Sequence, residues 1–176
     1  MKKTYGKYIA DDGGRSIYWP TAKDASDCVA RACAIATGTD YRDTFKTLCN
    51  IGADIGQLPN SEPVYEAFLE RHGFVKQKPP KRNGKKFPIR EWVATAPKGR
   101  IVALTREHLI AVVDNVQRDT WLDERCVNSW YHKAPCEIGP VDGCDDCAFL
   151  TEANESASVC PECYQDQVEE RANDKS

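Results

Sequence analysis

The stretch ASDCVARACAIATGTD, residues 25–40, decides the fold of this chain because it predicts the first long helix. Asp27 is placed to cap the helix N-terminus, and Gly38 lies where a C-terminal glycine cap belongs. The apolar positions between them follow helical spacing: Val29, Ala32, Cys33 and Ala36. Cys28 stands in the first turn, which leaves two interpretations: a small-residue core helix, or a helix that presents a reactive thiol at its N-terminus.

Two further helices follow. The second is capped by Asp40 and is expected to end at Gly52. The third runs from Ser61 to His72, and a short helical turn is predicted over 89–93. The first half of the chain is therefore mainly helical.

Extended segments dominate the second half. Three of them are rich in β-branched and apolar residues: 100–105, 108–114 and 116–121. Asp114 and Asn115 suit a tight hairpin turn between the last two. A short strand is also expected over 16–19, in the irregular entry segment. Helices followed by an antiparallel sheet predict the α+β fold class.

The composition predicts one main domain in a cytoplasmic protein. The chain has 176 residues, of which 41% are hydrophobic, and this is enough for one core. No apolar run resembles a secretory signal or a membrane span, and nine cysteines in such a chain favour metal binding or catalysis over disulfides. The run KQKPPKRNGKK, residues 76–86, has six basic residues and no aromatic residue for base stacking, so we interpret it as a solvated loop.

A nucleophilic cysteine needs a base, and His108 is the best candidate among three histidines. With a two-residue turn at 114–115, His108 faces Trp121 across the hairpin. The same register puts His108 and Asp119 on one face of the sheet, where the carboxylate can orient the imidazole. The N-terminus of a helix favours the thiolate form of Cys28. The alternative is that all three residues are structural: Cys28 is a buried core residue, His108 is a polar residue at the end of a strand, and Asp119 is a surface acid.

The order of these residues resembles the papain-like cysteine peptidases. The segments DCVARACAIATGTDYRDTFKTL and HLIAVVDNVQRDTW, within residues 20–122, are similar to small papain-fold proteins of phages and bacteria, themselves distantly similar to bacteriocin-leader-processing peptidases. The resemblance implies a nucleophile at Cys28, a general base at His108 and an orienting group at Asp119. The glutamine that precedes the cysteine in that family is replaced by Ala22.

The acidic C-terminal segment contains two Cys-x-x-Cys motifs. Their four cysteines are Cys144, Cys147, Cys160 and Cys163. Two such motifs can close a tetrahedral four-thiolate site, so they predict a structural Zn²⁺; two redox dithiols are the alternative. Three nearby residues could form another metal site: Cys126, His132 and Cys136. We therefore divide the chain into a papain-like domain over 1–136, a zinc module over 137–166 and a solvated tail over 167–176.

Three function classes follow from these patterns. The first is a thiol peptidase that cleaves a peptide or isopeptide bond in a protein or peptide substrate, within a host cytoplasm if the chain is phage-encoded. The second is a papain-like scaffold that has lost catalysis and recognises a host protein through its zinc module; the missing glutamine favours it. The third, nucleic-acid binding through residues 76–86, is disfavoured by the net charge of −3. No membrane partner is expected.

Overall fold

The computed structural model describes residues 4–21 and 26–133, which form a mixed α+β unit. The helices are α1 (Arg15–Tyr18), α2 (Cys28–Thr37), α3 (Tyr41–Ile55), α4 (Glu62–Arg71), α5 (Ile89–Trp92) and the 3₁₀ turn η1 (Val93–Thr95). The strands are β1 (Lys7–Ala10), β2 (Val75–Gln77), β3 (Lys81–Arg82), β4 (Lys85–Lys86), β5 (Arg100–Leu104), β6 (Leu109–Val113), β7 (Val116–Asp119) and β8 (Ser129–Lys133). The predicted α+β class is confirmed.

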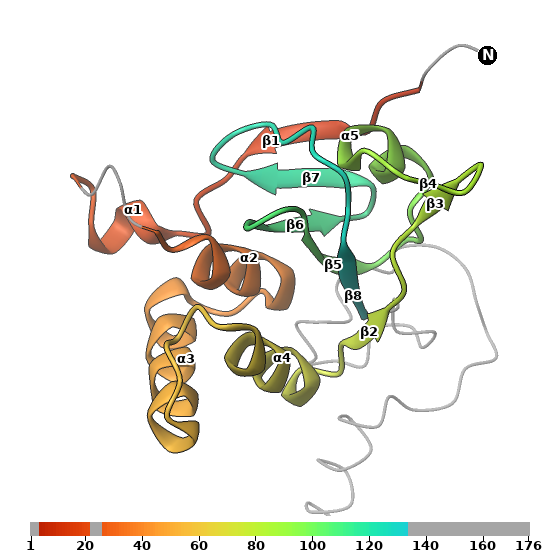
Figure 1. Ribbon diagram of the computed structural model, residues 1–176. Helices are drawn as coiled ribbons and strands as arrows, with labels where there is room; N and C mark the ends of the chain where they lie inside the picture. The colour runs from red at the N-terminus through yellow and green to blue at the C-terminus, as the bar shows by residue number, and fades with distance from the viewer. Residues whose placement is uncertain (1–3, 22–25, 134–176) are drawn as a thin grey trace, which may run out of the picture. The chain divides into compact units, whose positions relative to one another are not determined.

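One six-stranded sheet organises the unit, with strand order β1-β7-β6-β5-β8-β2 (Figure 1). Every neighbouring pair in it is antiparallel except β1 and β7, which run parallel. Helices α2, α3 and α4 lie on one side of this sheet in Figure 1. None of the helices in the described part of the chain has the length and apolarity needed to cross a membrane.

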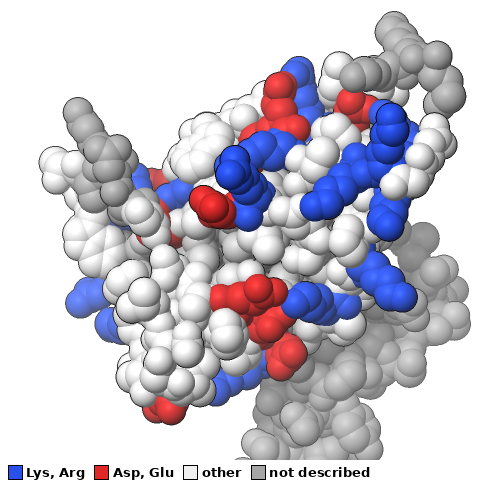
Figure 2. Space-filling model, in the orientation of Figure 1, with Lys and Arg blue, Asp and Glu red and all other residues white. Residues whose placement is uncertain are grey.

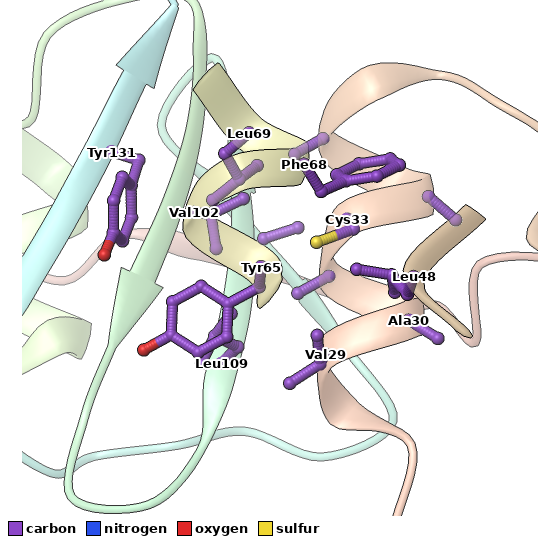
Figure 3. Packing of buried hydrophobic residues seen from close by; sticks show 14 of the residues in the cluster. Val29, Ala30, Cys33, Leu48, Tyr65, Phe68, Leu69, Val102, Leu109 and Tyr131 are labelled. Carbon is purple, nitrogen blue, oxygen red and sulfur yellow. The ribbon is translucent and has the colours of Figure 1, made fainter. Parts of the chain in front are cut away.

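The sheet has an apolar cluster on each face. On the α2 side, Cys33, Phe68 and Leu69 pack with Val102 and Tyr131 of the sheet (Figure 3). The cluster on the other face lies under α5 and η1 and includes Ile89, Trp92, Ile101, Ile110 and Val127. Because small residues dominate α2, this helix packs closely on the strands, and its N-terminal turn is held at one end of the sheet.

The predicted hairpin between β6 and β7 has the predicted register. Val113 pairs with Val116, and the turn residues Asp114 and Asn115 have positive φ values of 47° and 64°. Such a turn matches the twist of the flanking strands. The Asn115 side chain also donates to the carbonyl oxygens of Val93 and Ala96, at 2.9 and 2.7 Å. These contacts hold the turn against η1.

The entry segment differs from the prediction. Residues 15–18 form the single helical turn α1 and not a strand, because Asp12 accepts hydrogen bonds from the amides of Gly14 and Ser16 and so starts a turn. The strand of this segment is β1, which pairs in parallel with β7 more than 100 residues later. Sequence reasoning also missed β8, the second partner of β5.

Helix α3 does not end at Gly52, as predicted. It continues to Ile55 and is closed by Gly56, whose φ of 68° is left-handed. Gly52 is buried inside the helix because the chain returns across it: a Cβ there would lie 2.6 Å from the carbonyl oxygen of Gln57. This glycine is needed for a close backbone approach and not for a helix stop.

The basic run is partly structured. Strands β3 and β4 form a two-stranded hairpin within it, turning at Asn83 and Gly84, and the Lys and Arg side chains over this hairpin are visible in Figure 2. Residues 81–86 are all exposed. The predicted solvation is therefore correct, whereas the predicted loop is a hairpin.

Candidate active site

Cys28 opens α2 and is only partly buried. The residue before it, Asp27, occupies the N-cap position, but its side chain makes no capping hydrogen bond. The Asp27 carboxylate instead binds Arg31, one turn further along the helix, and accepts a 2.7 Å hydrogen bond from the Tyr41 hydroxyl. The capping role predicted for Asp27 is therefore wrong. The first amides of α2 therefore receive no cap from the Asp27 side chain.

His108 lies at the entrance to β6, after the turn that follows β5. Thr105 holds its backbone, because the Thr105 amide donates to the His108 carbonyl oxygen at 3.0 Å. The imidazole is 5% exposed and its Nε2 contacts Oδ2 of Asp119 in a short hydrogen bond. Its ring also stacks on Trp121, with centroids 4.3 Å apart, so the predicted cross-strand neighbour is confirmed.

Asp119 ends β7 and is held on several sides. Its backbone carbonyl oxygen accepts from the Asp11 amide at 2.9 Å and from the Tyr8 hydroxyl at 3.2 Å. Its Oδ1 accepts from the Thr120 amide at 2.7 Å, while Oδ2 faces the imidazole. The side chain is almost fully buried. Because both oxygens have partners, the carboxylate can fix the imidazole in one orientation.

The sulfur of Cys28 and the imidazole of His108 are hydrogen-bonded to each other. Since Nε2 is engaged by Asp119, Nδ1 is the ring nitrogen left for the sulfur. Figure 1 shows how distant parts of the chain meet here: α2 lies beside β6 and β7. The fold thus brings Cys28, His108 and Asp119 into one hydrogen-bonded chain, in the order that the sequence predicts.

Electrostatic effects favour the charged forms of this pair. Burial raises the pKa of the Cys28 thiol, but hydrogen bonds from His108 and the Leu109 amide, with the charges of His108 and Arg31, outweigh burial and lower it. Burial lowers the pKa of His108, but hydrogen bonds to Asp119 and Cys28 outweigh it and raise the pKa to about 9. Both shifts favour a thiolate beside an imidazolium over a neutral pair.

The other described cysteines have different environments. Cys33 is fully buried in the core, and burial raises the pKa of its thiol, which agrees with the packing role expected of this helix. Cys49 is partly buried on α3. Cys126 is also partly buried, and its Sγ lies 3.9 Å from the carbonyl oxygen of Lys86. Among the cysteines that the structure describes, Cys28 is therefore the one that lies beside a histidine.

Sequence reasoning missed Arg31 and its partners. Arg31 is 3% exposed and lies between the carboxylates of Asp27 and Asp119. The four-residue spacing of Asp27 and Arg31 on one helix was a signal for the first contact. The contact with Asp119 had no local signal, because 88 residues separate the two partners.

The predicted metal sites fall mainly outside the described residues. This applies to the four cysteines of the zinc prediction, at 144, 147, 160 and 163, and to Cys136. Within residues 4–21 and 26–133, no group of three or more His, Cys, Asp or Glu side chains could hold a metal ion. His132 contacts the carbonyl oxygen of Lys98 at 2.9 Å through Nε2.

Comparisons with protein-family models, with curated proteins and with solved structures found no match to this chain.

Proposed function

We propose that the chain is a papain-like cysteine peptidase that hydrolyses a peptide or isopeptide bond in a protein or peptide substrate. One observation carries this proposal: a cysteine at the N-terminus of a helix is hydrogen-bonded to a histidine, which a buried aspartate orients. The pKa shifts of Cys28 and His108 support the same assignment, because they favour the nucleophilic thiolate. The papain-like class itself rests on the resemblance of the segments around Cys28 and His108.

The proposed reaction has two stages. The Cys28 thiolate attacks the carbonyl carbon of the scissile bond, and the new C–S bond gives a tetrahedral oxyanion. As the C–N bond breaks, the His108 imidazolium gives its proton to the departing amine, and a thioester remains on Cys28. Water then attacks the thioester while His108 accepts a proton from it; the C–S bond breaks, the Cys28 thiolate is regenerated beside the imidazolium, and the carboxylic acid product leaves. The uncapped amides at the start of α2 are suited to stabilise the oxyanion.

The proposal predicts selective alkylation of Cys28. At pH 6 we expect iodoacetamide to modify Cys28 on the order of 10- to 100-fold faster than Cys49, because an ordinary thiol is almost wholly protonated at that pH. Residue-resolved mass spectrometry of the full chain over pH 5–9 measures both rates in one sample. Cys49 serves as the internal control because it is also only partly buried.

The second candidate function is a binding module that has kept the papain-like scaffold without its catalysis. Ala22, at the position of the family's glutamine, favours it. The alkylation experiment separates the two, since a Cys28 rate that follows the Cys49 rate at every pH would exclude the peptidase and leave the binding module.

We further propose that the C-terminal cysteines hold one structural Zn²⁺, as a module that stabilises the chain or recruits its protein substrate. Two closely spaced Cys-x-x-Cys motifs in an acidic segment support this, because few apolar residues are present to stabilise that segment without metal. Thiolate ligands would supply all four positions, so this ion is assigned no part in hydrolysis.

Metal analysis of the purified full chain should find about one zinc ion per protein molecule. The Cys144→Ser and Cys163→Ser variants should each retain far less zinc, whereas Cys126→Ser should keep the wild-type amount. Wild-type protein without bound zinc would contradict the zinc assignment. Zinc loss in Cys126→Ser would instead indicate that the metal is bound by the other candidate group, which contains Cys126, His132 and Cys136.

A further inference from the structure

A buried charged side chain near the candidate site, Arg31, is one that the reaction does not use directly. Arg31 lies in the first turn of α2, four residues after the N-cap residue Asp27, and is almost completely buried. Its Nη1 binds Oδ1 of Asp27, and its Nη2 lies 3.4 Å from Oδ1 of Asp119. The guanidinium therefore links the first turn of α2 to the end of β7.

This link continues to the imidazole. Oδ1 of Asp119 faces Arg31 and the Thr120 amide, which leaves Oδ2 for Nε2 of His108. A carboxylate held at both oxygens cannot rotate freely about its C–C bond. Arg31, at 3.4 Å, therefore acts on this oxygen together with the Thr120 amide, at 2.7 Å.

Arg31 is itself held from several elements. On the Asp27 side, Tyr41 of α3 donates to Oδ2 and Arg15 of α1 lies 3.5 Å from Oδ1. Trp121 stacks on His108 and lies under the guanidinium, with its ring centroid 5.8 Å from Cζ. The forked, planar guanidinium suits this bridging position better than a lysine ammonium would.

The charges around Arg31 balance when the reactive pair is ionised. The buried acids are Asp27 and Asp119, and the Cys28 thiolate adds a third negative charge. Three positive charges oppose them: Arg31, Arg15 and the His108 imidazolium. Arg125, from the segment after β7, adds a longer-range positive influence on Cys28 and Asp119, although Asp123 pairs with it. Without Arg31 the buried set would carry an excess negative charge, which disfavours the thiolate.

We propose that Arg31 is a positioning residue: it holds Asp119, and through Asp119 His108, in the orientation in which His108 activates Cys28. This inference rests on the proposed function. The site would then contain four charged side chains in two oppositely charged pairs: Cys28 with His108, and Asp119 with Arg31. The start of α2 would supply both the thiol of Cys28 and the guanidinium that orients the Asp119 carboxylate.

The test compares the pH profile of Cys28 alkylation in four full-length proteins: wild type, Arg31→Gln, Arg31→Lys and the control Arg71→Gln. Arg71 is exposed on α4, so its removal changes net charge by the same amount away from the site. Nitrogen chemical shifts of His108, followed by NMR against pH, report the ionisation of the imidazole in each variant. Near-UV circular dichroism verifies folding before each profile is taken.

We expect Arg31→Gln to move the alkylation midpoint to higher pH and to slow the reaction at pH 6 by about three- to tenfold. Arg31→Lys should lie between Arg31→Gln and wild type, because it keeps the charge but not the fork. Arg71→Gln should match wild type. If Arg31→Gln does not fold, Arg31→Lys carries the test, since its midpoint still moves in the same direction.

The outcomes separate this inference from the proposed function. A purely structural role for Arg31 would reduce the folded fraction but leave the midpoint and the His108 titration of the remaining protein unchanged, and that result overturns the inference alone. A wild-type Cys28 that reacts as slowly as Cys49 overturns the proposed function, and the inference with it.

Discussion

Replacing His108 with alanine is expected to slow the alkylation of Cys28 at pH 6 on the order of 10- to 100-fold. In wild type, His108 donates a hydrogen bond to the sulfur and adds a positive charge beside it, and both effects lower the pKa of Cys28. The variant keeps the burial that raises this pKa but loses the largest opposing effect, the His108 hydrogen bond, together with the His108 charge. The thiol should therefore be protonated at pH 6 and regain reactivity only as the pH rises.

Residue-resolved alkylation rates over pH 5–9 measure this effect, and His132→Ala is the matched control. His132 lies on β8 and contacts the carbonyl oxygen of Lys98, so its loss should leave the Cys28 profile unchanged. Equal profiles for wild type and His108→Ala would show that the imidazole does not activate the sulfur, and the peptidase proposal would fail.

Replacing Cys28 with serine is expected to change how stability depends on pH. The unfolded chain holds one proton on this pair between about pH 6.5 and 8.5, on the thiol. The native pair also holds one proton above the folded-state pKa of Cys28, on the imidazole. At any pH in this range that lies above the folded-state pKa of Cys28, proton numbers are equal in the two states, and the pair gives wild-type stability no pH slope.

In Cys28→Ser only the histidine titrates. The folded-state pKa of His108 stays above its unfolded value because the hydrogen bond that its Nε2 donates to Asp119 remains. A raised pKa contributes stability that is fully present below about pH 6.5 and is lost as the pH rises through the folded-state pKa. The free energy of unfolding of Cys28→Ser should therefore fall by about 1 to 2 kcal/mol, relative to wild type, as the pH rises from 6.5 to 8.5.

Urea unfolding at four or five pH values between 6 and 9 measures this difference, in which the titrations of all unchanged groups cancel. The double variant Cys28→Ser with His108→Ala is the control, because it should remove the added slope. Parallel curves for wild type and Cys28→Ser would mean that His108 does not keep a raised pKa in the folded variant, and the stabilisation of the imidazolium by Asp119 would be wrong.

Local signals explain which parts of the fold were predictable. Helix α2 begins at Cys28 and is closed by Gly38, as its apolar spacing and glycine indicate. The hairpin register follows from the turn at 114–115, and the stacking of His108 on Trp121 follows from that register. Each of these depends on residues close in sequence, or on a two-residue turn that fixes its strands.

Predictions failed where a contact other than the helix pattern itself decides the structure. Gly52 looks like a helix stop, but the chain returning at Gln57 requires a glycine inside the helix. Asp27 looks like a cap, but Arg31 and Tyr41 take its carboxylate. In both cases a specific backbone or side-chain contact outweighs a local preference that is worth only about 1 kcal/mol.

The sequence by itself determined helices α2 to α4 and strands β5 to β7, the placing of Cys28 at a helix start and the hairpin that pairs His108 with its neighbours. Only the tertiary structure decided that β1 joins β7, that α2 rests its first turn at the end of the sheet, and that Arg31 reaches Asp119. The physical reason is that periodicity, caps and turns depend on residues a few positions apart. A buried ion pair such as Arg31 with Asp119 forms only when folding brings residues from distant parts of the chain together.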